Sequence, residues 1–243
     1  MHSVLVYHTI SEPVEPLPGD IDIPRRRFLR QVQWLARWRR VARLEDTLSN
    51  SGKSLTAITF DDGFRDNLTV ALPLLEKFNL PMTLFVSAAF VGREGYLSPH
   101  ELREIARHPL VTIGAHGLWH RHFTQLSTQD ARAELLASRS LLQTITAQSI
   151  DFMAWPFGEC NEELEALSRE CGYRAAWSVW KGSNDTYSRW RVPLGRRDNL
   201  IRFIAKVSGA YALTKAKWHR TRTPGETPVT TAPELQPQSN HLY

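Results

Sequence analysis

The alternation of strand-type and helix-type segments constrains this chain more than any other feature of its sequence. Short apolar runs alternate with segments of helical periodicity along most of the 243 residues, which predicts a parallel sheet with right-handed helical crossovers. The predicted strands are residues 4–7, 55–60, 83–86, 111–114, 152–155 and 174–179. The predicted helices are residues 67–78, 100–107, 130–144, 162–171 and a segment that begins at Pro24, with Phe28, Val32 and Leu35 facing the core. The fold class is therefore α/β, and the length suits one barrel domain.

The composition changes after about Thr221, where Pro, Thr, Gln and Glu dominate and few residues are apolar. We predict a catalytic domain over residues 1–221 and a disordered tail over residues 222–243. Residues 206–220 are basic with scattered aromatic side chains, which suggests a final helix that lies on the barrel or touches a membrane.

The formal net charge of +5 favours anionic partners such as acidic glycans, phosphate carriers or a membrane surface. No nucleic-acid-binding module is recognisable, so we expect no nucleic acid partner. Cys160 and Cys171 are too few for a disulfide framework and are expected to be reduced thiols. Because no signal-peptide pattern or spanning segment is recognisable, we expect a cytoplasmic protein, with the inner face of the membrane as a further place of action.

The segment that follows Pro24 carries arginines opposite its apolar face. This face either binds anionic lipid or a phosphate-bearing carrier, or is an ordinary solvated surface with arginine stems lying over apolar atoms. The arginines are Arg25, Arg26, Arg30, Arg37, Arg39 and Arg40.

The candidate functional residues directly follow predicted strands; they are His8, Asp61, Asp62, His116 and Phe157. In barrel folds the carboxyl ends of the strands surround one mouth, and the functional site lies there. We therefore expect these residues to lie close together.

Two pairs among these residues suit a metal centre. His116 and His120 are four residues apart, and on a helical turn both imidazoles would share one face, although the spacing alone also fits an incidental pair. Asp61 and Asp62 follow an apolar strand and precede Gly63, which permits a sharp bend that would bring both carboxylates to one site. A capping aspartate followed by a solvated one is the alternative.

Together the pairs supply two imidazoles, one ligating carboxylate and one carboxylate that is free to accept a proton. Catalytic zinc sites use three protein ligands and leave a position for water, which a neighbouring carboxylate can deprotonate. Such a ligand set accepts zinc, cobalt, nickel or iron, of which we expect zinc.

The motifs around these residues resemble those of the polysaccharide deacetylase family, the NodB homology domain of carbohydrate esterase family 4. Thr59-Phe60-Asp61-Asp62-Gly63 is similar to the first motif, His116 to His120 to the second, and Ala154-Trp155-Pro156-Phe157-Gly158 to the third. Val6-Tyr7-His8-Thr9-Ile10 resembles the opening of the branch that includes de-N-acetylases of poly-N-acetylglucosamine. The resemblance covers residues 4–200 and implies the distorted (β/α) barrel of the NodB type.

The resemblance also implies a role for each matching residue. Asp61 corresponds to the general base, and Asp62, His116 and His120 correspond to the metal ligands. The backbone N–H of Phe157 corresponds to the oxyanion donor, and His8 to the general acid of this branch. A core histidine whose ring bonds to the backbone is the alternative for His8.

Several positions depart from the family pattern. Gly117 stands where Ser or Thr is usual, Trp155 where Arg or Tyr is usual, and Phe157 where Tyr is usual. The missing arginine leaves open which residue orients Asp61, with Arg65, Arg191 and Arg196 as candidates. No Leu-x-His motif follows residue 122, so the acid role depends on His8.

We predict substrate contacts for Trp155, Pro156 and Arg196. Asp66 and Asn67 either line the site or only begin a helix. The tryptophans near the last strands either stack on a sugar ring or pack the barrel, and packing is preferred because aromatic residues dominate cores. They are Trp177, Trp180 and Trp190.

The expected function is metal-dependent hydrolysis of an N-acetyl group on an amino sugar. The substrate would be a bacterial cell-envelope polysaccharide or its lipid-linked precursor. The alternatives are a deformylase acting on a carrier-linked amino sugar and a glycan-binding barrel without activity.

Overall fold

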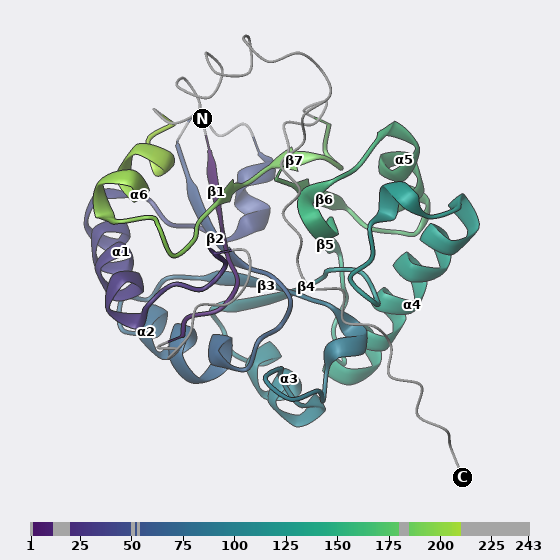
Figure 1. The fold of residues 1–243 in the computed structure, drawn as a ribbon, viewed down its shortest axis with the longest axis horizontal. Coiled ribbons are helices and arrows are strands. Elements are labelled where there is room, and N and C mark those ends of the chain that lie inside the picture. Colours follow the sequence, from purple (N-terminus) through teal and green to yellow (C-terminus); the bar gives the residue numbers. More distant parts are fainter. Residues whose placement is uncertain (1, 12–19, 50–51, 53, 180–184, 210–243) are drawn as a thin grey trace.

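The computed structural model describes residues 2–11, 20–49, 52, 54–179 and 185–209 of the chain. A parallel sheet curves into a barrel and helices surround it on the outside, as Figure 1 shows. The strands are β1 (Ser3–Tyr7), β2 (Thr56–Phe60), β3 (Met82–Val86), β4 (Val111–Ala115), β5 (Phe152–Ala154), β6 (Ala175–Ser178), β7 (Arg189–Trp190) and β8 (Val192–Pro193). The α-helices are α1 (Arg25–Trp38), α2 (Leu72–Glu76), α3 (Pro99–Ala106), α4 (Thr128–Thr146), α5 (Glu162–Glu170) and α6 (Leu200–Val207).

The sheet confirms the predicted (β/α) barrel. Its hydrogen-bonded order is β7-β6-β5-β4-β3-β2-β1-β8, and every neighbouring pair is parallel. The six predicted strands are all present, and no bound differs from the prediction by more than one residue. Because all strands run the same way, their carboxyl ends meet at one mouth of the barrel.

The barrel is closed by one short segment that the sequence patterns did not reveal. Its first half, β7, pairs with β6, and its second half, β8, pairs with β1. Arg191 lies at the point where the segment changes partner, and its side chain is fully buried. Two-residue strands are too short to leave a periodic pattern, which explains why the sequence did not predict them.

Side chains fill the barrel interior. Phe85, Phe152 and Trp177 form its aromatic centre, with the Trp177 ring 6.0 Å from Phe85 and 5.5 Å from Phe152 between centroids. The prediction that Trp177 packs the barrel is confirmed, since this side chain has no exposed surface. Trp180 lies outside the described residues.

A second and larger core lies between the strands and the outer helices. Tyr7, Phe28 and Phe60 pack there ring against ring, with centroids 5.2 to 5.9 Å apart. These contacts fix α1 against β1 and β2, as the apolar spacing of its residues predicted.

Two helices have recognisable capping residues, and one predicted helix begins differently. Ser98 and Glu101 form a capping box at the start of α3, and Gly172 follows α5 with a φ of +86°. The helix predicted over residues 67–78 begins instead as a π-helical turn, Asn67–Ala71, before α2. Pro73 has no N–H to donate into the preceding turn, which accounts for the altered hydrogen-bond pattern of this helix.

The C-terminal predictions are only partly within the described residues. α6 covers Leu200–Val207, and the remainder of the predicted 206–220 helix and the predicted tail over 222–243 lie outside them. No helix in the described part is both long and apolar enough to cross a bilayer.

Gly114 tests how tightly the barrel interior is packed. A Cβ at this position would lie 2.5 Å from Cδ1 of Phe85 and 3.0 Å from the Phe152 carbonyl oxygen. We expect Gly114→Ala to lower the free energy of unfolding by about 1–3 kcal/mol through overpacking. Urea denaturation followed by circular dichroism measures this change, and an unchanged midpoint would contradict the packing described here.

Candidate active site

The chemically active side chains gather at the mouth formed by the carboxyl ends of the strands. Asp61 and Asp62 follow β2, His116 follows β4, and His8 follows β1. Pro156 and Phe157 follow β5 across the barrel. The expected convergence of these segments is therefore present in the fold.

Left-handed backbone at three non-glycine residues shapes the site. Asp62, His120 and Phe157 have φ values of 73°, 55° and 57°. Such a conformation costs of order 1–3 kcal/mol and is concentrated at functional sites. At Asp62 it reverses the side chain direction that an extended strand would impose, so the carboxylates of Asp61 and Asp62 reach the same side.

The histidine pair is not on a helical turn, and that part of the sequence interpretation was wrong. His116 directly follows β4, while His120 lies in a loop. The loop turns back through Gly117, whose φ is +73° and whose added Cβ would meet Phe123 and Pro156 at 3.2 and 3.3 Å. A side chain is therefore strained at this position, which explains the departure from Ser or Thr.

Asp62, His116 and His120 form a cluster suited to one metal ion. Their ligand atoms all lie within 4.8 Å of one another. Oδ1 of Asp62 is 3.6 Å from Nε2 of His116 and 3.4 Å from Nε2 of His120. Tetrahedral zinc with bonds of about 2.0–2.1 Å separates its ligand atoms by about 3.4 Å, so the spacing fits.

The hydrogen bonds around this cluster also fit a cation. Nδ1 of His116 lies 2.8 Å from the Ala154 carbonyl oxygen, which can only accept a hydrogen bond, so Nδ1–H donates and Nε2 presents its lone pair to the site. Oδ1 of Asp62 is buried and has no hydrogen-bond partner among the described residues. A buried carboxylate oxygen without a donor is expensive unless a cation compensates it.

Burial shifts the pKa values of the three candidate ligands. It raises the pKa of Asp62 to about 6, an effect that the Asp61 charge strengthens and a protonated His8 opposes. Burial lowers the pKa of His116 to about 3 and that of His120 to about 4. Both imidazoles are therefore neutral near pH 7, which is the state that ligates metals.

Arg191 is the arginine that orients Asp61. Its two terminal nitrogens donate to the two carboxylate oxygens of Asp61 at 2.7 and 2.8 Å, and both side chains are almost completely buried. Burial would raise the pKa of Asp61, but the charge and the hydrogen bonds of Arg191 outweigh it and hold the pKa at about 2. Asp61 is thus ionised at neutral pH and fixed by a bidentate pair.

The other two arginine candidates are engaged elsewhere. Arg65 is exposed and pairs with Glu101 at 2.6 Å. Arg196 pairs with Asp22 at 2.8 Å. An arginine from the closing segment therefore supplies the group that the third motif lacks.

Trp155 occupies that position in the third motif, and it is completely buried. Its Nε1 donates to the Tyr187 carbonyl oxygen at 2.8 Å, and its ring packs against Phe123. Pro156 is buried as well. The predicted substrate contact of the Trp155 side chain is corrected to a packing role, because no part of the side chain is exposed.

His8 lies in the same site with an unsatisfied ring. Nδ1 of His8 is buried and has no partner among the described residues, so it is not a core histidine bonded to the backbone. The segment around it is held by two residues that follow the first motif. Asn67 donates to the His8 carbonyl oxygen at 2.8 Å, and a carboxylate oxygen of Asp66 accepts from Thr9 and from the Ile10 amide.

Aromatic and acidic residues that the sequence did not single out complete the surroundings. Tyr96 stacks on Phe64 at 4.8 Å, and burial and the Asp62 charge raise the pKa of Tyr96 to about 12. Glu134 accepts from the amides of Leu118 and Trp119, so α4 fixes the loop before His120. These residues lie outside the three motifs and carry no spacing that relates them to the site.

The fold and the cluster define an α/β barrel with a candidate mononuclear metal site of two imidazoles and a carboxylate, next to an arginine-bound carboxylate. Residues 49–176, more than half of the chain, match the family model described as polysaccharide deacetylase. The chain belongs to the polysaccharide deacetylase family, as its motifs indicated.

Individual relatives agree with this assignment. YxkH of Bacillus subtilis is 26% identical over 187 residues, which cover 74% of this chain and 65% of YxkH. The poly-β-1,6-N-acetyl-D-glucosamine N-deacetylase of Staphylococcus aureus is 25% identical over 151 residues, covering 54% of this chain and 51% of that protein. The chain thus spans less than two thirds of either relative. The structure of BC0361, a polysaccharide deacetylase from Bacillus cereus, shares the fold with a TM-score of 0.75 at 21% identity, covering 85% of this chain and 68% of that one.

The raised pKa of Asp62 predicts how metal affinity depends on pH. Below pH 6 the carboxyl group must lose a proton before it ligates, whereas both imidazoles are already neutral. We expect the Zn²⁺ association constant to fall roughly tenfold per pH unit below this value and to change little just above it. Competition with a chromogenic chelator measures the constant.

Asp61→Asn is the matched variant for this titration. It removes the charge that raises the pKa of Asp62 but none of the three candidate ligands, so the pH below which the Zn²⁺ association constant falls should be lower. An unchanged pH for this fall, or an affinity without pH dependence, would contradict the assignment of Asp62 as a ligand.

Proposed function

We propose that this protein is a metal-dependent hydrolase that removes an N-acetyl group from an amino sugar of a bacterial cell-envelope polysaccharide or of its lipid-linked precursor. The observation that carries the proposal is the ionised Asp61 carboxylate, held by Arg191 beside the cluster of Asp62, His116 and His120. A glycan-binding barrel has no need of such a fixed carboxylate next to a candidate metal site.

Asp62, His116 and His120 would hold the divalent cation, with zinc as the expected metal. A cation bound there lowers the pKa of water toward neutrality and polarises an amide carbonyl. The orphaned Oδ1 of Asp62 and the fixed tautomer of His116 support this assignment.

Asp61 is the general base of the proposed reaction. It accepts a proton from the attacking water, and Arg191 holds the carboxylate so that its position does not change during the transfer. Oδ2 of Asp61 lies 3.7 Å from Nε2 of His116, so the base is next to the candidate metal ligands without belonging to the cluster.

His8 and Phe157 serve the remaining needs of amide hydrolysis. The leaving amine needs a proton, and His8 has an imidazole nitrogen that no described residue engages. The backbone N–H of Phe157, in its left-handed conformation, is the donor proposed for the developing oxyanion. Such a donor is worth about 3 kcal/mol in the transition state.

The substrate class follows from the relatives rather than from the site. The Staphylococcus aureus relative is named as a poly-β-1,6-N-acetyl-D-glucosamine N-deacetylase, which supports an N-acetylated hexosamine substrate. An assay of acetate and formate release from free and carrier-linked oligosaccharides would separate deacetylation from deformylation.

Asp61→Asn tests the base directly. The amide keeps the shape of the carboxylate and leaves the three candidate ligands in place, so metal content should stay at the wild-type level. We expect kcat to fall by roughly a hundredfold to ten-thousandfold, the usual contribution of a positioned base. Acetate release measures the loss of kcat, and metal analysis of the same sample measures the retained metal. Turnover at the wild-type rate would remove Asp61 from the mechanism.

Arg191→Met tests the positioning of that base. Loss of the guanidinium removes the charge that lowers the pKa of Asp61 and leaves a buried carboxylate without its partner, so this pKa should rise. A carboxylate with a raised pKa becomes protonated at higher pH. The acid limb of the kcat/KM profile should therefore move upward.

Arg196→Met is the matched control, because Arg196 pairs with Asp22 rather than with Asp61. Its acid limb should coincide with that of the wild type. If both variants show the same profile, Arg191 has only a structural role.

A further inference from the structure

Basic and acidic residues are segregated along this chain. Residues 23–44 and 199–225 contain 14 of the 30 Lys and Arg residues and none of the 25 Asp and Glu residues. The remaining residues therefore hold 16 basic and 25 acidic side chains and a net charge of −9. The overall value of +5 hides two strongly cationic stretches in an otherwise acidic protein.

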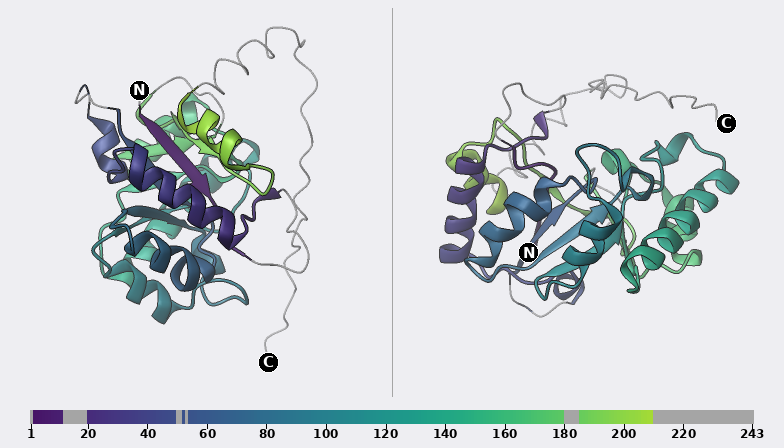
Figure 2. Two further views of the ribbon diagram at one scale, coloured as in Figure 1. Left: turned by 90° about the vertical axis from the view of Figure 1, so that its left-hand side faces the viewer. Right: turned by 90° about the horizontal axis from the view of Figure 1, so that it is seen from below.

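Within the described residues, the fold brings these two stretches together. They contain α1 and α6, which lie side by side on one flank of the barrel in the left view of Figure 2. Trp34 of α1 meets Phe203 of α6 edge to face at 5.7 Å. Gln31 of α1 donates to the Asp198 carbonyl oxygen just before α6. Two helices about 170 residues apart in the chain thus lie side by side on one flank.

The arginines on this surface are solvated and uncompensated. Five arginines are exposed, and none of them forms an ion pair with a carboxylate in the part of the chain that the structure describes. These arginines are Arg25, Arg26, Arg30, Arg37 and Arg202. Together with the apolar residues Trp38, Leu200 and Ile201, they form what we call the α1–α6 flank.

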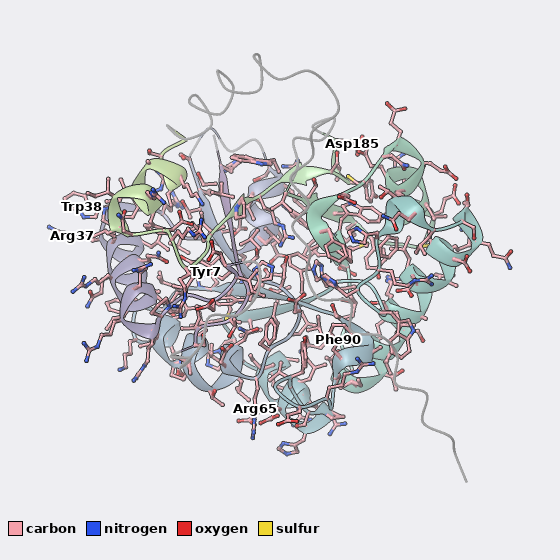
Figure 3. All side chains as sticks on the ribbon, in the orientation of Figure 1. Tyr7, Arg37, Trp38, Arg65, Phe90 and Asp185 are labelled. Atoms are coloured by element: carbon pink, nitrogen blue, oxygen red, sulfur yellow. The ribbon has the colours of Figure 1, made fainter. Side chains whose placement is uncertain are left out.

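Apolar side chains project from the same flank. Ile201 is 79% exposed and Trp38 is 66% exposed, the two highest values among the large apolar residues of the described chain. Figure 3 shows Trp38 next to Arg37 at the outer edge of α1, and the Arg37 guanidinium lies 5.4 Å from the Trp38 ring centroid. Trp38 thus lies beside Arg37, and Ile201 directly precedes Arg202 in the chain.

We propose that the α1–α6 flank docks on the surface of an anionic lipid bilayer. Arginines that pair with no carboxylate among the described residues attract lipid phosphates, while exposed Trp and Ile side chains enter the boundary between headgroups and acyl chains. A nucleic acid would satisfy the arginines but would leave Ile201 in water. The combination of charge and exposed apolar side chains therefore favours a bilayer.

Binding to vesicles tests this proposal independently of any catalytic activity. The full-length protein is sedimented with phosphatidylcholine vesicles and with vesicles that also contain phosphatidylglycerol. We expect binding only to the anionic vesicles, and weaker binding as salt rises because the charges on the flank are solvent-exposed.

Two double variants with the same change in net charge separate the flank from the overall charge. Arg26→Glu with Arg30→Glu alters the flank and should weaken the partition coefficient by more than roughly tenfold. Lys77→Glu with Arg107→Glu alters exposed residues at the ends of α2 and α3 and should bind like the wild type. Ile201→Ser tests the apolar part and should weaken binding at constant charge. Thermal melting confirms that each variant is folded.

The proposal fails if the wild type does not bind anionic vesicles at low salt, or if both double variants lose binding equally. It also fails if DNA, at equal phosphate concentration, displaces the protein from the vesicles and Arg26→Glu with Arg30→Glu weakens DNA binding equally.

Discussion

Arg191 and Asp61 lie almost without solvent contact, and each would be unfavourable alone. A buried carboxylate without a partner would protonate, and a buried guanidinium has no neutral form to adopt. Their bidentate contact joins the segment that closes the barrel to the strand that carries the first motif. The ionisation of the buried base therefore depends on barrel closure, because the closing segment carries the guanidinium that pairs with Asp61.

The two neighbouring aspartates show how environment divides one residue type into two roles. Asp61 has its own cation, which lowers its pKa, whereas Asp62 is buried, has no donor to Oδ1 among the described residues and has a raised pKa. Neutral imidazoles adjoin Asp62 at ligand distances. The arrangement leaves one carboxylate in need of a cation and keeps the other from competing for it.

The distribution of surface charge is separate from the chemistry of the site. The acidic remainder of the chain includes the site residues, while the two cationic stretches, residues 23–44 and 199–225, contain no carboxylate side chain. Charges in a single solvated surface contribute little to folding, so stability does not account for this segregation. The proposed anionic bilayer would account for it.

The sequence by itself determined the alternating fold, the strand ends at which chemistry occurs, and the residue types Asp61, Asp62, His116 and His120. These features are local, since periodicity and turn residues record them within a few positions. The tertiary structure decided which arginine serves Asp61, how a left-handed loop rather than a helix presents His120, and that Trp155 is buried. The physical reason is that each of these depends on contacts between residues far apart in the chain, as between Asp61 and Arg191, 130 positions away. Barrel closure selects such partners, and no local pattern encodes that selection.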